Sequence, residues 1–110
     1  MKLLTKEILK KVPSIEATAE TSIAASVVVA KFFNPTGAGT WYMTAYDPNT
    51  NEAFGFVNLG DSEMAELGYF SMTELEQFKG RIGLGIERDR SFTSMPLQEV
   101  MDTIHRGGHI

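Results

Sequence analysis

The stretch Thr40-Trp41-Tyr42-Met43-Thr44-Ala45-Tyr46, together with Glu52–Leu59 shortly after it, decides the fold. These residues include the only Trp, and the wider region Phe32–Phe78 holds every Phe and Tyr except Phe92. Between the two runs lies Asp47-Pro48-Asn49-Thr50-Asn51, in which Asp, Pro and Asn are typical turn residues. The sequence therefore predicts a β-hairpin that supplies most of the core.

If this hairpin closes symmetrically, residues face each other across the two strands, and the residue numbers of every facing pair add up to the same value. The expected facing pairs are Tyr42 with Phe56, Thr44 with Phe54, and Tyr46 with Glu52. One face of the sheet would then carry Tyr42, Thr44, Tyr46, Phe54 and Phe56, and the other Trp41, Met43 and Ala45 opposite Val57, Gly55 and Ala53. Gly55 would leave space for a neighbouring side chain. We expect helices to cover at least one face.

The chain before the hairpin predicts a short helix, a connection, a strand and a loop. Thr5 is the expected N-cap of a helix through Val12, which Pro13 ends. Ser14–Ser22 has no clear period and is expected to be a connection. Ile23–Phe33 predicts a strand buried on both faces, although its Ala-rich first half would also suit a helix. The Pro and Gly residues of Asn34–Gly39 predict a loop.

The chain after the hairpin predicts a polar connection over Asn58–Leu67, and then a short strand, Gly68-Tyr69-Phe70. Ser71 and Glu74 match a capping box, which starts a helix that Gly80 ends. Ile82–Arg90 alternates apolar residues with Gly and then alternates charge sign, as an edge strand would. A last helix is expected from Thr93–Pro96 through Ile104, and Gly107-Gly108 terminates it.

These elements predict an α+β fold in a single domain. The expected architecture is a mainly antiparallel sheet of about four to five strands with two to three short helices. A length of 110 residues suits one domain, and the contents of 43% apolar and 22% charged residues are typical of a folded protein. We expect the globular domain to span residues 1–106 and residues 107–110 to form a frayed C-terminal tail.

Composition limits the chemistry and the location of the protein. The chain has no Cys, so it forms neither a disulfide nor a thiolate metal site or nucleophile. The apolar run at the N-terminus stops at Leu4, which predicts no export signal, and Ile23–Phe33 is about half as long as a membrane helix. We therefore expect a cytoplasmic protein without a membrane span and without a cofactor.

Several of these segments together resemble a small bacterial family. The similarity rests on Leu3-Leu4-Thr5-Lys6-Glu7-Ile8, Phe32-Phe33-Asn34-Pro35, Thr40-Trp41-Tyr42, Asp47-Pro48, Phe54-Gly55, Glu66-Leu67-Gly68-Tyr69-Phe70-Ser71 and Ile86-Glu87-Arg88-Asp89, in this order. The family is catalogued as domain of unknown function twenty-nine fifty-eight. The resemblance implies a single-domain cytoplasmic bacterial protein, often encoded on plasmids or other mobile elements, with no assigned activity and no known catalytic residues.

Phosphate, metal and nucleic-acid sites receive little support. The Asn34–Gly39 loop lacks the Lys-Ser/Thr ending of a phosphate-binding loop. His105 and His109 have a spacing that suits a metal on a helix, but two glycines between them disfavour that helix, so no metal is predicted. Aromatic side chains could stack on bases, yet no Lys or Arg lies between Lys31 and Lys79. Direct nucleic-acid binding is therefore not expected.

The acidic residues leave two alternatives open. Carboxylates could converge in the manner of a hydrolase, and the candidates are Asp47, Glu52, Glu66, Glu87 and Asp89. Alternatively, the acids could share one surface and imitate DNA, as an anti-restriction protein would. The sequence identifies no catalytic residue, and a non-enzymatic role is favoured.

The leading hypothesis is a small non-enzymatic protein-interaction or accessory module of mobile DNA. Its expected surface comprises the hairpin, the Asn34–Gly39 loop and the Asp61–Glu66 loop, and its expected ligand is a protein. The candidate interaction or pocket residues are Asn34, Tyr42, Tyr46, Asp47, Glu52, Glu66, Tyr69, Glu87 and Asp89. The sequence leaves the partner's identity and the oligomeric state open.

Overall fold

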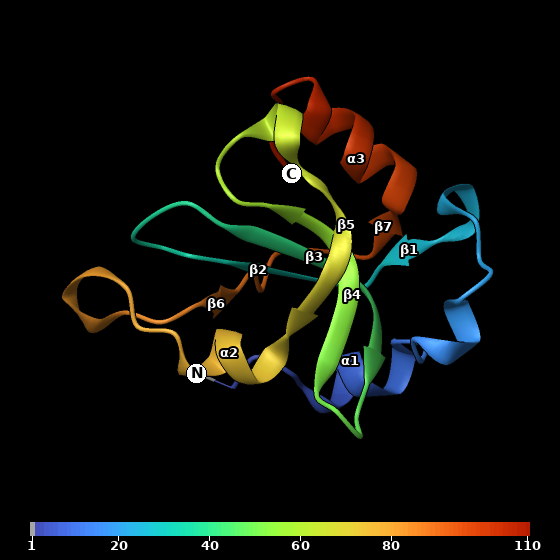
Figure 1. Cartoon of the computed structure of the whole chain (residues 1–110), viewed down its shortest axis with the longest axis horizontal. Coiled ribbons are helices and arrows are strands. Elements are labelled where there is room, and N and C mark those ends of the chain that lie inside the picture. Colours follow the sequence, from blue (N-terminus) through green and yellow to red (C-terminus); the bar gives the residue numbers. More distant parts are fainter. Residues whose placement is uncertain (1) are drawn as a thin grey trace.

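A five-stranded antiparallel sheet forms the centre of the computed structural model, which describes residues 2–110 (Figure 1). Its strands lie in the order β5-β4-β3-β2-β6, and their bounds are β2 Ala30–Phe33, β3 Thr40–Asp47, β4 Glu52–Asn58, β5 Glu66–Ser71 and β6 Glu87–Arg88. A separate two-stranded sheet pairs β1, Val27–Val28, with β7, Met95–Pro96. The helices are α1 Lys6–Lys11, α2 Met72–Gln77 and α3 Leu97–His105. The predicted α+β class with a mainly antiparallel sheet is confirmed.

Short 3₁₀ turns occupy four of the connections: η1 Glu16–Thr18, η2 Ile23–Ala25, η3 Ser62–Met64 and η4 Arg81–Gly83. No helix within residues 2–110 is long and apolar enough to cross a membrane.

Two apolar cores lie on opposite faces of the sheet, so both faces are covered. The first core packs under α1, α2 and the N-terminal segment, and it includes Leu3, Ile8, Phe32, Met43, Phe70, Met72 and Leu75. The second packs under α3 and the β1–β7 pair, and it includes Val28, Tyr42, Phe56, Leu97, Val100 and Ile104. Figure 1 shows α1 and α2 on one side of the sheet and α3 with β7 on the other.

The hairpin of β3 and β4 contains a β-bulge at Thr44 that the symmetric pairing did not predict. Tyr42 pairs with Phe56 and Met43 with Gly55 as expected, but beyond the bulge Tyr46 pairs with Ala53. The extra residue turns Tyr46 onto the face of Met43. The prediction that Tyr42 and Tyr46 share a face is therefore wrong. The expected pairs Thr44 with Phe54 and Tyr46 with Glu52 are wrong for the same reason.

Gly55 lies where the backbones of β3 and β4 approach each other closely. A Cβ atom on Gly55 would lie 1.8 Å from the carbonyl oxygen of Tyr42. The sequence had suggested that a neighbouring side chain would fill the space beside Gly55. The main chain of β3 fills it instead. Close backbone approach is a requirement that only glycine satisfies.

The predicted single strand Ile23–Phe33 is divided between three elements. Its first residues form η2, where the Ser22 hydroxyl accepts a hydrogen bond from the Ala25 N–H over 3.2 Å. Val27–Val28 then pairs with Met95–Pro96, while Ala30–Phe33 pairs with β3 in the main sheet. The helical alternative for the first half was closer to this outcome, because the Ala-rich turn forms where a capping Ser precedes it.

The edge strand expected over Ile82–Arg90 is shorter than predicted. Only Glu87–Arg88 pairs with β2, and Arg81–Gly83 forms the turn η4 instead. The glycines at 83 and 85 supply no side chains to pack against β2, which weakens strand pairing before Ile86.

Two of the three predicted helix starts, at Thr5 and Ser71, agree with the structure. Thr5 Oγ1 accepts a hydrogen bond from the Ile8 N–H over 3.2 Å, and Ser71 Oγ accepts one from the Glu74 N–H over 3.1 Å. These bonds satisfy backbone donors that have no partner in the first turn of a helix. The expected start of the last helix within Thr93–Pro96 is wrong: Met95–Pro96 pairs with β1 as strand β7, and α3 begins at Leu97 with the extended Pro96 as its N-cap.

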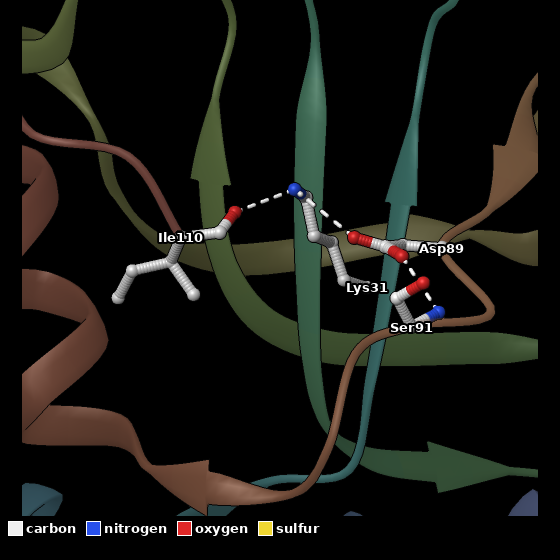
Figure 2. Close-up of polar contacts among 4 residues, drawn as sticks. All are labelled: Lys31, Asp89, Ser91 and Ile110. Atoms are coloured by element: carbon white, nitrogen blue, oxygen red, sulfur yellow. Dashed lines mark hydrogen bonds and ion pairs between the residues drawn. The ribbon is translucent and has the colours of Figure 1, made fainter.

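The C-terminal residues 107–110, expected to be frayed, contact the domain. The Gly108 N–H donates to the Thr103 carbonyl oxygen over 2.9 Å, and Ile110 packs against the core under α3. Figure 2 shows Lys31, on β2, between Ile110 and Asp89. The Lys31 ammonium donates to the Ile110 oxygen and lies 3.4 Å from the Asp89 carboxylate.

Candidate protein-interaction edge

The two edges of the main sheet differ in how they are protected. At one edge β6 has two residues, and Arg88 Nη1 donates to the carbonyl oxygens of Lys2 and Leu3 over 3.0 and 3.3 Å. The N-terminal segment is thus tied beside β6. At the other edge β5 has six residues, and within residues 2–110 it pairs only with β4. Natural proteins usually shorten, charge or cover such an edge because it can pair with another chain.

The backbone of β5 offers free hydrogen-bonding groups at this edge. In an antiparallel ladder, residues alternate between pointing their N–H and C=O toward the paired strand and away from it. The Met72 N–H donates to the Asn51 carbonyl oxygen over 2.9 Å, and this bond sets the alternation along β5. The N–H and C=O groups of Gly68 and Phe70 then point toward β4, whereas those of Leu67 and Tyr69 point outward. An incoming strand could bond to all four of these outward groups.

Exposed apolar side chains surround this edge. Tyr69 is 62% exposed, Leu59 70% and Met64 74%, although each carries a large apolar group. The Tyr69 ring is held by an edge-to-face contact with Phe54, with 4.9 Å between the ring centroids. A groove of about 340 Å³ runs along the strand, lined by Val57, Leu59, Asp61, Met64, Glu66, Leu67, Gly68 and Tyr69. Exposed apolar surface next to free backbone groups is typical of a protein-binding site.

Gly68 lies in the middle of this groove, and the space above it is open. A Cβ atom on Gly68 would have no heavy atom within 4 Å apart from its own chain neighbours. Gly68 pairs with Gly55 of β4, but the main chain of β3 fills the space beside Gly55, so the open space lies at Gly68. The groove can therefore receive a large side chain from outside.

Acidic residues flank β5 at both of its ends. Asp61, Glu63 and Glu66 lie at the start of the strand, and all three are exposed. At the other end, Glu52 pairs with Ser71, and Glu74 and Glu76 follow on α2. No Lys or Arg occurs between Lys31 and Lys79, so β4, β5 and the turn η3 carry no positive charge of their own. Arg106, at the end of α3, lines a surface hollow together with Asp61 and Glu63, whereas Glu66 lies outside that hollow.

Two of the tyrosines predicted at the site are structural. Tyr42 and Tyr46 are 2% and 8% exposed, and they belong to different cores. Burial, and then the negative charge of Asp89, raise the pKa of Tyr42 to about 12. Burial, followed by the charges of Glu76 and Asp47, also raises the pKa of Tyr46. Both phenols are therefore protonated at neutral pH, and the Tyr46 hydroxyl donates to Asn51 Oδ1.

The five carboxylates that could have formed a hydrolase site lie in three places. Asp47 and Glu52 pair across the end of the hairpin. Glu66 is at the β5 edge, and Glu87 and Asp89 lie at the opposite edge, on or next to β6. Among residues 2–110, no group of three or more Asp, Glu, His or Cys side chains is arranged to hold a metal ion.

Asn34 acts within its own loop. Its Oδ1 atom accepts hydrogen bonds from the backbone N–H and the hydroxyl of Thr36, over 3.1 and 3.2 Å. Its amide nitrogen donates to the Ala38 carbonyl oxygen over 3.3 Å. Of the predicted site residues, Tyr69 and Glu66 thus lie together at the exposed β5 edge.

His105 fixes the turn that carries Met64. Its Nε2 atom lies 2.9 Å from the Ala65 carbonyl oxygen, and its ring packs edge-on against Phe56 with 5.3 Å between centroids. His105, whose spacing from His109 had indicated only a disfavoured metal ligand, therefore helps to position one wall of the groove.

A second concave region lies between the connection 14–26 and the bulge in β3. It consists of two adjoining cavities of about 240 and 400 Å³ that share the hydroxyl-bearing residues Thr18, Thr21, Ser26 and Thr44. Among residues 2–110, the ionisable side chains that line these cavities are Lys11 and Tyr69. The Lys11 Nζ atom donates to Ser94 Oγ over 3.1 Å. This lining provides no pair of groups for acid–base chemistry.

Sequence reasoning missed Leu59, Met64 and Gly68. Two signals were present: apolar residues in the polar connection Asn58–Leu67, and a Gly inside a predicted strand. A strand glycine often marks a place where another chain approaches. Exposure could not be read from the sequence, because isolated apolar residues in connections are often buried.

Comparison with known proteins gives a family and no function. Neither the curated proteins nor the solved structures include a match to this chain. The family model described as "Protein of unknown function (DUF2958)" matches residues 3–110, as the resemblance noted in the sequence had led us to expect. The chain therefore belongs to the DUF2958 family.

Proposed function

We propose that this protein is a non-enzymatic protein-interaction module that binds an extended segment of a partner as an additional strand on β5. One observation carries the proposal: β5 is a six-residue edge with outward backbone groups and an apolar groove beside it, while the opposite edge is short and tied to the N-terminal segment. Strand addition of this kind gains affinity from main-chain hydrogen bonds and specificity from pockets for alternate side chains.

The arrangement favours this role over the two acid-based alternatives. The hydrolase alternative needs converging carboxylates, whereas the candidates lie at both sheet edges and at the hairpin end. The DNA-mimic alternative needs a continuous acidic surface, whereas the apolar middle of β5 separates two acidic groups. An accessory role on mobile DNA, which the family resemblance implies, is compatible with a small binding module and forms part of the proposal.

Selection from a display library of random twelve-residue peptides, combined with amide hydrogen exchange, tests the proposal. We expect selected peptides to slow exchange at Leu67 and Tyr69, whose N–H groups point outward, and to change Gly68 and Phe70 much less, because theirs already bond to β4. This alternation is specific to strand addition.

The variant Tyr69→Pro tests the strand addition directly, because it removes an outward donor and leaves the bonds to β4 in place. Tyr69→Pro should fold and lose most peptide binding. Leu9→Pro would be unsuitable as a control, because α1 needs the hydrogen bond that the Leu9 N–H donates. Leu9→Glu, on the exposed side of α1, should leave binding unchanged. Peptides that protect other amides, or a library that yields no binder, would contradict the proposed function.

A further inference from the structure

We infer that the segment bound at β5 is basic at its ends and apolar at its centre, with one large apolar side chain opposite Gly68. This inference rests on the proposed function and specifies the chemistry of the partner. It follows from the placement of open space, apolar walls and acidic residues along a single strand.

The central position follows from the groove. A residue of an added strand that lies opposite Gly68 projects its side chain to the face on which Gly68 has no Cβ. That space is open, and Val57, Leu59 and Met64 line it. Aliphatic and thioether walls of this kind suit an apolar side chain, and Met adapts to its shape. The neighbouring positions of the added strand lie beside Leu67 and Tyr69, which also favour apolar contacts.

The basic positions follow from the acids at the two ends. Glu66 lies two residues before Gly68 on the same face, so a residue two positions from the central one can place its charge beside Glu66. Asp61 and Glu63 add negative charge at that end, and Glu74 and Glu76 add it at the other, about 17 Å away along a six-residue strand. Because both ends are acidic, the charge preference holds for either direction of the added segment.

The same charges disfavour a second copy of this chain as the occupant. Antiparallel pairing of two β5 strands would bring the Glu66 end of one copy against the Ser71 end of the other. Both ends are acidic, so this pairing would bring the Glu66 end of each copy toward the acids on α2 of the other. Like charges directly opposite one another destabilise a sheet. A basic segment of another protein has the complementary charge.

Three fluorescein-labelled peptides distinguish these possibilities. The basic probe is Lys-Lys-Val-Phe-Val-Lys-Lys, the neutral probe replaces every Lys by Gln, and the acidic probe replaces every Lys by Glu. Binding is measured by fluorescence anisotropy at low and high salt, and amide exchange at Leu67 and Tyr69 locates the site. We expect the basic probe to bind at least about tenfold more tightly than the neutral one at low salt, with the difference shrinking as salt screens the charges.

Two variants and one control locate the contacts on the protein. Glu66→Lys should weaken the basic probe by about three- to tenfold, since it replaces an attraction by a repulsion at a partly screened site. Gly68→Val fills the open space and should weaken all three probes, with little effect on the fold because no atom lies near the new Cβ. Glu7→Lys makes the same change of net charge on the exposed side of α1, beside the opposite edge of the sheet, and should leave binding unchanged.

The outcomes separate this inference from the proposed function. If the neutral probe protects Leu67 and Tyr69 as strongly as the basic one, the charge inference is overturned and strand addition stands. If none of the probes protects these amides, both ideas are contradicted. If analytical ultracentrifugation shows dimers that Gly68→Val dissociates, the occupant is a second copy and the basic segment is refuted.

Discussion

Substituting Gly55 by Ala should severely destabilise the protein, whereas the same substitution at its cross-strand partner Gly68 should not. The two glycines face each other in the β4–β5 ladder and share the same strand environment. They differ in what a new Cβ meets: the Tyr42 carbonyl oxygen at 1.8 Å for Gly55, and nothing within 4 Å for Gly68. The pair therefore isolates the effect of close backbone approach.

The size of the effect can be worked from the geometry. Real Cβ contacts are essentially never shorter than 3.0 Å, so β3 and β4 must separate by at least the difference from 1.8 Å, which is 1.2 Å. A ladder hydrogen bond of about 2.9 Å would lengthen to about 4.1 Å and break. Breaking two buried backbone bonds costs about 1–3 kcal/mol for each group left unpaired. Two broken bonds leave four groups unpaired, so we expect Gly55→Ala to lower the free energy of unfolding by at least about 4 kcal/mol.

Urea denaturation followed by far-UV circular dichroism measures both variants. A loss of this size is a large fraction of the roughly 5–15 kcal/mol that stabilises a typical domain, so Gly55→Ala should unfold at much lower urea or fail to fold. Gly68→Ala should change stability by less than about 1 kcal/mol, in the stabilising direction, because Ala restricts the unfolded chain. Equal midpoints for the two variants would refute the close approach of β3 and β4 at Gly55.

Three further predictions concern single side chains. Because the pKa of Tyr42 is raised to about 12, its contribution to the free energy of unfolding is fully present below pH 10 and is lost as the pH rises toward about 12. At pH 11 the wild type should have lost about 1.4 kcal/mol of this free energy, whereas Tyr42→Phe should lose none of it. Urea titrations of both proteins at pH 8 and pH 11 measure the difference. Ser71→Ala removes the cap on the Glu74 N–H and should cost about 1 kcal/mol in thermal or urea unfolding, with Ser71→Thr as the conservative control. His105→Ala should speed amide exchange in the turn before Ala65, because the imidazole no longer holds its carbonyl oxygen; unchanged exchange there would show that His105 does not fix the turn.

Local sequence signals predicted the helices and the hairpin well. The capping residues Thr5 and Ser71 act through bonds within one turn, so their effect depends on few other residues. The turn Asp47–Asn51 and the aromatic strands beside it were likewise predicted by short-range chemistry. The α+β class followed from these elements, because both faces of the predicted hairpin are apolar and helices had to pack against at least one of them.

The bulge at Thr44 and the exposure of β5 were beyond such reasoning. Neighbouring residues do not specify a bulge, which depends on how β3 meets its partners on both sides. The division of Ile23–Phe33 depends on β7, about seventy residues later in the chain. Tyr69 and Glu66 were among the predicted site residues, but their shared edge required the strand order, which a single sequence does not contain.

The bulged strand β3 also makes the two cores one cooperative unit. A single strand, β3, carries Tyr42 into one core and Met43 and Tyr46 into the other. Neither core can therefore unfold while the other core holds β3 in place. Amides in β2, β3 and β4 should therefore open with one common free energy, whichever face their side chains occupy. We therefore expect this chain of 110 residues, which divides its apolar side chains between two thin layers, to unfold in one step.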